Sequence, residues 1–145
     1  MSKLSLVAFR TGAWISIVTA LVHLAGHVAG PQAPRNETEA KLTELMATYG
    51  FALPGAPRRT MMELFDGFSL TFSLFLAVVG ILALAIAKSR GAVPELYRFT
   101  AVALAGTFGI LLGLSLRYFF LAPSICLGLA FLAFAASLGS SRTES

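Results

Sequence analysis

Four long apolar stretches dominate the pattern of hydrophobic and polar residues along the chain. They cover residues 11–29, 64–87, 99–116 and 121–138, and Asp66 is the one charged side chain within them. An α-helix needs about 20 mostly apolar residues to cross the hydrocarbon core of a bilayer. The pattern therefore predicts an all-α integral membrane protein, with residues 1–145 as a single membrane domain in which four spans form an antiparallel bundle.

A shorter amphipathic helix is predicted over residues 37–49, in the long connection between the first two spans. Asn36 followed by Glu39 is a typical helix start. Apolar side chains then recur at helical spacing on one face, at Leu42, Leu45, Met46 and Tyr49. We expect this helix to lie on the membrane surface or to cap the bundle, and its low content of Lys and Arg favours capping.

The residues after this helix predict a stop, an irregular link and a new start. Gly50 is typical of the position that ends a helix. The segment from Phe51 to Arg59 is expected to be irregular. Thr60 and Glu63 then have the spacing of a capping box, which predicts that the second membrane helix begins at this point.

The distribution of charge predicts the orientation of the spans. Four spans place both termini and the middle loop on one side, which carries six Lys and Arg and two Glu. The opposite side carries five Lys and Arg and five Asp and Glu. Because positively charged loops stay in the cytoplasm, both termini of this multi-pass protein are predicted to be cytoplasmic.

Composition agrees with a membrane protein and excludes several classes of site. The chain is 57% hydrophobic and 12% charged, about half the charged fraction of a soluble domain. Its net charge of +4 is spread over helix ends, which is typical of a topology signal and does not predict nucleic-acid binding. The single cysteine, Cys126, excludes a disulfide within the chain and a cysteine-based zinc or iron–sulfur site.

One group of ionisable residues lies at the outer ends of the first two spans. His23 and His27 are four residues apart and therefore lie on one face of their helix. Glu63 and Asp66 are three apart at the start of the second span. If these spans pack together, two imidazoles and two carboxylates are expected to share an outer-leaflet pocket. Polar groups at such a depth are costly and suggest function.

Three interpretations of this group stay open at the level of sequence. Two imidazoles with one or two carboxylates suit a divalent transition metal. A histidine beside an acid also suits proton transfer or ligand binding. Alternatively, Glu63 serves only its capping box, and His23 forms a hydrogen bond to Ser or Thr on a neighbouring span that merely locks the bundle.

The third span carries a ladder of small residues. Ala105, Gly109 and Gly113 are four residues apart, and the two glycines form a GxxxG motif. Such ladders allow close approach of helices. We expect this one to pack against the fourth span or, through Gly109 and Gly113, against another subunit of a homo-oligomer or larger membrane complex.

Parts of the sequence resemble a family of small bacterial four-span membrane proteins. The resemblance rests on Arg10-Thr-Gly-Ala-Trp14, the two histidines, Asn36-Glu-Thr-Glu-Ala40 and Leu64-Phe-Asp-Gly-Phe-Ser-Leu70, and it extends to about Leu76. The chain is also similar to DoxX-type proteins in size and topology only. The four-span family is uncharacterised, so the resemblance to it implies a bacterial cytoplasmic membrane and no catalytic or binding residue.

These observations lead to two hypotheses about function. The first is an accessory subunit or a ligand-binding membrane protein with a polar His/Glu/Asp pocket at the outer leaflet. The alternative is a small membrane enzyme or a redox or metal protein that uses His23, His27, Glu63 and Asp66, with His23 and Asp66 as candidate catalytic residues. The sequence does not decide between an enzyme and a binding protein.

Overall fold

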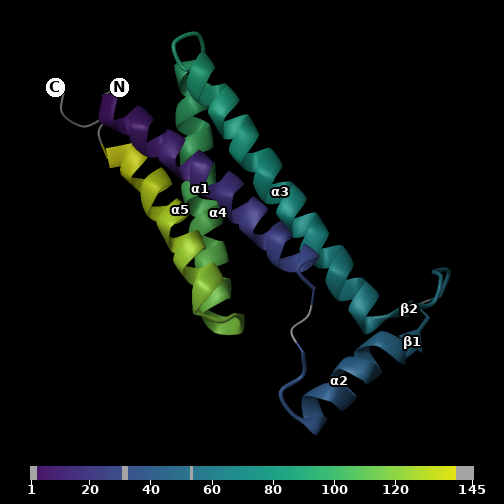
Figure 1. The fold of residues 1–145 in the computed structure, drawn as a ribbon. Helices are drawn as coiled ribbons and strands as arrows, with labels where there is room; N and C mark the ends of the chain where they lie inside the picture. The colour runs from purple at the N-terminus through teal and green to yellow at the C-terminus, as the bar shows by residue number, and fades with distance from the viewer. Residues whose placement is uncertain (1–2, 31–32, 53, 140–145) are drawn as a thin grey trace.

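Four long helices, one short helix and a small two-stranded ribbon make up the protein, as seen in a computed structural model that describes residues 3–30, 33–52 and 54–139 (Figure 1). In chain order the elements are α1 (Lys3–Val28), α2 (Glu37–Thr48), β1 (Gly50–Phe51), β2 (Arg59–Thr60), α3 (Met61–Ser89), α4 (Pro94–Tyr118) and α5 (Leu121–Gly139). By length and composition α1, α3, α4 and α5 are able to cross a membrane. The predicted all-α bundle of four apolar helices is thus confirmed.

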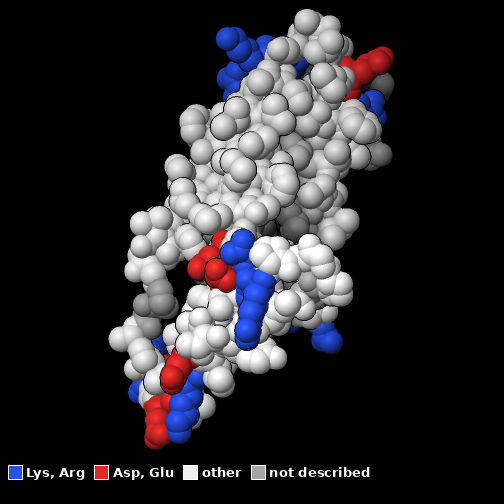
Figure 2. All heavy atoms as spheres, turned by 90° about the vertical axis from the view of Figure 1, so that its right-hand side faces the viewer, with Lys and Arg blue, Asp and Glu red and all other residues white. Residues whose placement is uncertain are grey.

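The helices α1, α3 and α4 are longer than the apolar stretches, because polar residues that flank the stretches are also helical. The N-terminal end of α1, the C-terminal end of α5 and the α3–α4 connection lie at one end of the bundle (Figure 1). The segment with α2 and the ribbon lies at the other. Charged side chains are found at both ends of the face drawn in Figure 2, with an uncharged surface between them. This distribution suits a multi-pass membrane protein, while its orientation and its bacterial location stay predictions.

The helix α1 is the centre of the bundle. It packs against α3 on one side and α5 on the other, whereas α4 packs mainly against α5 and makes few contacts with α3. Small residues let α1 come close to α5 and to α3. A Cβ on Gly12 would lie 2.9 Å from the ring of Phe134 in α5, and one on Gly80 of α3 would lie 2.7 Å from the main-chain oxygen of Ala13.

The core lies between the four long helices and includes residues from each of them. Its largest fully buried side chains are four aromatic rings, Phe9, Tyr97, Phe108 and Phe134. The Phe9 ring lies 4.6 Å from Tyr97 and 5.5 Å from Phe134, measured between ring centroids. Aromatic pairs at such separations are favourable beyond their buried area. These rings therefore tie α1, α4 and α5 together.

The helix α2 begins as predicted and ends for a different reason. The amide of Glu39 donates a 2.8 Å hydrogen bond to the side chain of Asn36, which caps the helix. Gly50, however, does not have the positive φ of a helix-terminating glycine. It lies in β1 and pairs with Thr60 of β2. The two ends of the link that was expected to be irregular, Phe51 and Arg59, thus pair in a short antiparallel ribbon. Between them the described residues form neither helix nor strand, as expected.

The expectation that α2 caps the bundle is not met. None of its twelve residues is buried. Its contacts are with α3 and β2, and Met46 is half-buried. The apolar side chains of Leu42, Leu45 and Tyr49 are 56%, 61% and 65% exposed. A cap would require these side chains to be covered by the spans, so α2 lies beside the end of α3 rather than over the bundle.

Candidate functional site

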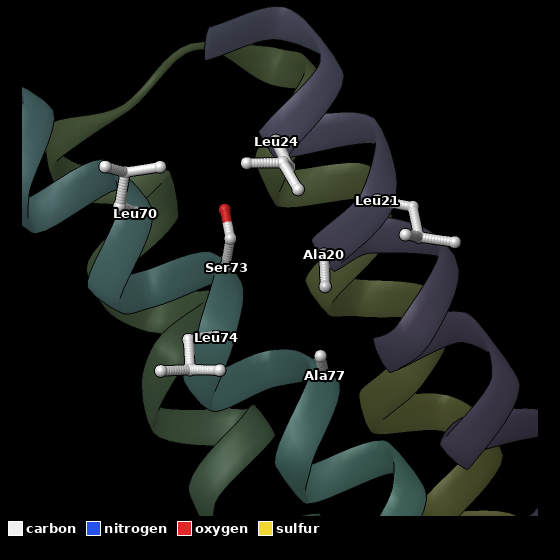
Figure 3. Close-up of a pocket in the computed structure, with 7 residues that line it drawn as sticks. All are labelled: Ala20, Leu21, Leu24, Leu70, Ser73, Leu74 and Ala77. Atoms are coloured by element: carbon white, nitrogen blue, oxygen red, sulfur yellow. The ribbon is translucent and has the colours of Figure 1, made fainter. Parts of the chain in front are cut away.

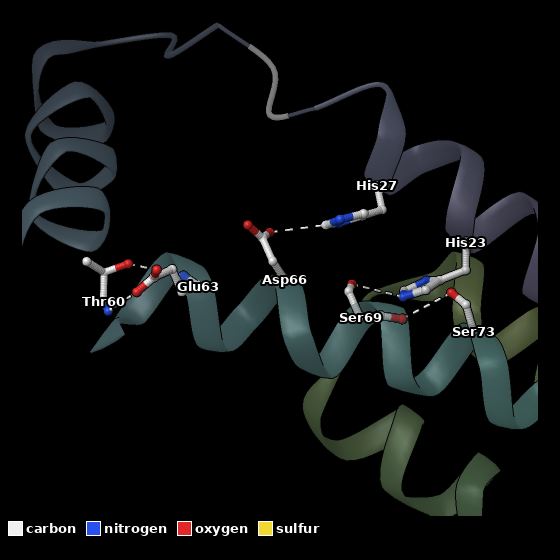
Figure 4. Close-up of polar contacts among 7 residues, drawn as sticks. All are labelled: His23, His27, Thr60, Glu63, Asp66, Ser69 and Ser73. Atoms are coloured by element: carbon white, nitrogen blue, oxygen red, sulfur yellow. Dashed lines mark hydrogen bonds and ion pairs between the residues drawn. The ribbon is translucent and has the colours of Figure 1, made fainter. Parts of the chain in front are cut away.

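The four predicted site residues lie near the C-terminal end of α1 and the N-terminal end of α3, where they form three separate sets of interactions (Figure 4). His23 and His27 extend from α1 toward α3. Asp66 lies opposite His27, and Glu63 lies one turn further out on α3. Of the four, His27 and Asp66 face each other, whereas His23 bonds to Ser69 and Glu63 bonds to Thr60.

His23 forms a hydrogen bond with Ser69 of α3. Its Nε2 lies 3.1 Å from Oγ of Ser69. Its ring also contacts the edge of Phe72, with 5.3 Å between the ring centroids. Two neighbours thus fix the imidazole between α1 and α3. The interpretation in which His23 bonds to a hydroxyl on a neighbouring span is confirmed.

His27 faces the carboxylate of Asp66. Nδ1 of His27 lies 3.8 Å from Oδ1 of Asp66, and the two side chains are 24% and 50% exposed. A separation of 3.8 Å is longer than a hydrogen bond. Both groups consequently keep hydrogen-bonding capacity for a third partner. His27 and Asp66 are thus the two predicted site residues that the structure brings together, and each can form a further hydrogen bond.

Glu63 is engaged in the start of its own helix. One of its carboxylate oxygens accepts a 2.7 Å hydrogen bond from the amide of Thr60, and the Thr60 hydroxyl accepts one from the amide of Glu63. These two bonds form the predicted capping box. The other carboxylate oxygen lies 3.5 Å from a guanidinium nitrogen of Arg59. Glu63 is therefore a structural residue rather than a partner of the histidines.

The predicted metal site is not supported by this arrangement. Within residues 3–30, 33–52 and 54–139, no three His, Cys, Asp or Glu side chains lie close enough to hold a metal ion together. A transition-metal site in a protein ordinarily needs at least three such ligands. His27 and Asp66 supply two, and the bond between His23 and Ser69 holds the next imidazole away from them.

An apolar groove lies one turn deeper than the His27–Asp66 pair, between α1 and α3 (Figure 3). Its volume is about 260 Å³. Six of its lining side chains are aliphatic, and the hydroxyl of Ser73 points into the space between the helices. The lining residues are Ala20, Leu21, Leu24, Leu70, Ser73, Leu74 and Ala77. Sequence analysis missed this groove.

The groove exists because of an alternation of residue size along both helices. At the level of Gly80, α1 and α3 are in contact through backbone. Toward the outer end, Ala20 and Ala77 leave space that the leucines surround but do not fill. The Ser73 hydroxyl donates a 3.0 Å hydrogen bond to the main-chain oxygen of Ser69, the residue that holds His23. Groove and polar contacts therefore share one segment of α3.

The GxxxG motif is divided between two environments. A Cβ on Gly109 would lie 3.2 Å from the ring of Phe131, so this glycine serves the packing of α4 against α5. At Gly113, no heavy atom of the described residues lies within 4 Å of the position that a Cβ would take. The use of the motif between subunits stays a prediction.

Comparisons with protein families, with curated proteins and with solved structures found no match for this chain. The resemblance noted in the sequence therefore adds no residue assignment, and the geometry of α1 and α3 carries the functional argument.

Proposed function

We propose that this small membrane protein binds a lipid-like molecule with an uncharged polar head in the groove between α1 and α3. The observation that carries the proposal is the succession along this interface. An aliphatic groove of about 260 Å³ is followed, one helical turn outward, by the pair His27 and Asp66. Such a succession matches an apolar chain that ends in a polar group at the level of the lipid headgroups.

The lining of the groove supports an apolar chain as its occupant. Binding sites for small molecules are mostly apolar and carry a few polar groups that fix orientation. Leu21 and Leu74, on opposite walls, offer methyl groups, and Ser73 offers an oxygen. Leu21 is also 59% exposed and Leu74 65% exposed, so the groove opens to the side, where lipid surrounds a membrane helix. A ligand can enter from the bilayer.

The polar end of the site supports an uncharged head. A hydroxyl or carbonyl group can bond to the imidazole of His27, and a hydroxyl can also donate to the carboxylate of Asp66. A phosphate would meet that carboxylate as a like charge. The nearby cations have other partners, since Nε of Arg58 donates to the main-chain oxygen of Gly50 and Arg59 pairs with Glu63.

Photocrosslinking tests this proposal. The probes are a diazirine-bearing farnesol and the matching farnesyl phosphate, added to the protein in nanodiscs. We expect the alcohol to label peptides that contain Leu21, Leu24, Leu70 or Leu74, and the phosphate to label them several-fold less. Ala77→Phe fills the groove and should reduce this labelling, whereas Ala85→Phe, on an exposed part of the same helix, should not.

Two results would contradict the proposal. One is labelling spread evenly over the lipid-facing sides of α1, α3, α4 and α5. The other is labelling of the groove that survives Ala77→Phe. Equal labelling by the two probes would reject the uncharged head while leaving the groove as a site for chains.

A second candidate function is that of an accessory subunit, and the surface of α4 favours it. Gly106 and Gly113 lie seven residues apart on this helix, and both face open space among the described residues. Residues seven apart lie on nearly the same face of a helix, and small residues on a helix face let another helix approach closely. Co-purification from native membranes tests this function. A partner that is lost with Gly106→Leu/Gly113→Leu but kept with Ala85→Leu supports it, and a protein recovered alone rejects it.

A further inference from the structure

We infer that α2 is embedded in the outer leaflet of the bilayer that the spans cross, with its exposed apolar side chains inserted among the lipids. Leu42, Leu45 and Tyr49 form this apolar face, and each is more than half exposed. They follow the helical period and therefore form one continuous stripe.

The position of α2 brings this stripe to the level of the membrane boundary. The helix contacts α3 and β2, and α3 begins immediately after β2, at Met61. In Figures 1 and 4, α2 lies across the direction of the long helices. On α3, Phe65 and Phe68 are 64% and 74% exposed only four and seven residues after Met61. Apolar surface thus continues from the outer turns of a span toward α2.

The charges of α2 indicate how it would bind. Lys41 pairs with Glu37 at 2.7 Å on the polar side of the helix. The carboxylate of Glu39 accepts a hydrogen bond from the amide of Arg35, and Glu44 adds a further negative charge. This helix has more acids than bases, unlike helices that bind anionic lipids through Lys and Arg. Insertion of apolar side chains is therefore the attraction, and uncharged lipid suffices.

The boundary between lipid and water is a suitable environment for the side chains of Leu42, Leu45 and Tyr49. Tyr49 has an apolar ring and a polar hydroxyl, a combination that is enriched where lipid meets water. Moving a leucine side chain from water into an apolar environment is favourable. Two leucines and a tyrosine are enough to hold α2 against the leaflet, since the chain on either side already connects it to two spans.

Site-directed fluorescence tests the inference. The protein carries the substitution Cys126→Ala and a single new cysteine, Leu45→Cys, labelled with the environment-sensitive fluorophore NBD and reconstituted in phosphatidylcholine vesicles. The control is Glu44→Cys, at the residue before Leu45, whose side chain points about 100° away around the helix. We expect blue-shifted emission at position 45, with quenching by a shallow lipid-borne nitroxide, and quenching by aqueous cobalt ions at position 44.

Each other outcome rejects the inference. Equal quenching of both positions by cobalt would place α2 in water. Protection of position 45 from both quenchers would mean that protein covers it, either the bundle or a second copy of the chain. Leu42→Cys provides an independent repeat on the same face. Addition of anionic phosphatidylglycerol should leave the emission at position 45 unchanged, and a marked further blue shift would show that charge, not apolar insertion, binds α2.

Discussion

Nε2 of His23 in α1 lies 3.1 Å from Oγ of Ser69 in α3. The next serine, Ser73, donates to the main-chain oxygen of Ser69 and also lines the apolar groove. These two hydrogen bonds connect His23 to the wall of the candidate binding site. It also separates His23 from Asp66, which faces His27 instead.

The first prediction concerns the free energy that the His23–Ser69 bond contributes. In a double-mutant cycle with His23→Leu and Ser69→Ala, we expect a coupling energy of about 0.6 kcal/mol, a usual value for side-chain hydrogen bonds between membrane helices. Unfolding in mixed micelles by titration with SDS, followed by circular dichroism, measures it. His27→Leu combined with Ser69→Ala should be additive, since His27 faces Asp66. Equal coupling in both cycles would contradict the assignment.

The second prediction concerns Gly80, where α3 comes closest to α1. A Cβ here would lie 2.5 Å from Cγ1 of Ile17 and 2.7 Å from the main-chain oxygen of Ala13. The backbone atom cannot rotate away, so Gly80→Ala should destabilise the protein by about 1–3 kcal/mol through overpacking. Gly67→Ala is the control in the same helix, because no described atom lies within 4 Å of its Cβ position. Similar unfolding midpoints for both variants would show that α1 and α3 are less closely packed.

The third prediction concerns a hydrogen-bond cluster at the opposite end of the bundle. The hydroxyl of Tyr97 donates to the main-chain oxygen of Ser5 at 3.2 Å, and the Ser5 hydroxyl donates to the main-chain oxygen of Ser137 at 2.6 Å. These bonds link α4, α1 and α5 in a buried region. Tyr97→Phe should therefore lower the free energy of unfolding by about 1 kcal/mol. Tyr118→Phe, at a residue that is 72% exposed, should leave it unchanged, and an equal loss in both variants would be unexpected.

The fourth prediction follows from the separation of the ionisable side chains. We expect elemental analysis to find the same metal content in the purified protein and in His23→Ala/His27→Ala, since no described group of three His, Cys, Asp or Glu residues is close enough to share an ion. About one equivalent of zinc, iron, manganese or copper that is lost in the variant would overturn this expectation and restore the metal hypothesis.

The fifth prediction concerns orientation. In a Cys126→Ala background, Thr38→Cys in α2 should react with a membrane-impermeant maleimide added to intact cells, because the positive-inside rule places α2 outside. Gly91→Cys, in the connection between α3 and α4, should react only after the membrane is opened. Both residues are exposed, so accessibility to water does not limit the reaction. The reverse pattern would invert the topology.

The four apolar helices could be predicted from the sequence, since long apolar stretches have few alternatives in a chain with so few charges. Backbone groups in lipid must be paired within each segment, which makes every such stretch a helix. Local signals were equally informative. The capping box of Thr60 and Glu63 needs only residues three positions apart, and it is present in the structure.

The pairing of polar side chains between α1 and α3 depends on the tertiary structure. The spacing of His23 and His27 fixes their common face, but the register between α1 and α3 assigns one to Ser69 and the other to Asp66. The two helices also pack closely at Gly80, fourteen residues along α3 from Asp66, where a Cβ would lie 2.7 Å from the main-chain oxygen of Ala13. The groove, the ribbon and the exposed face of α2 likewise arise from contacts between distant segments, which no pattern within a single segment can specify.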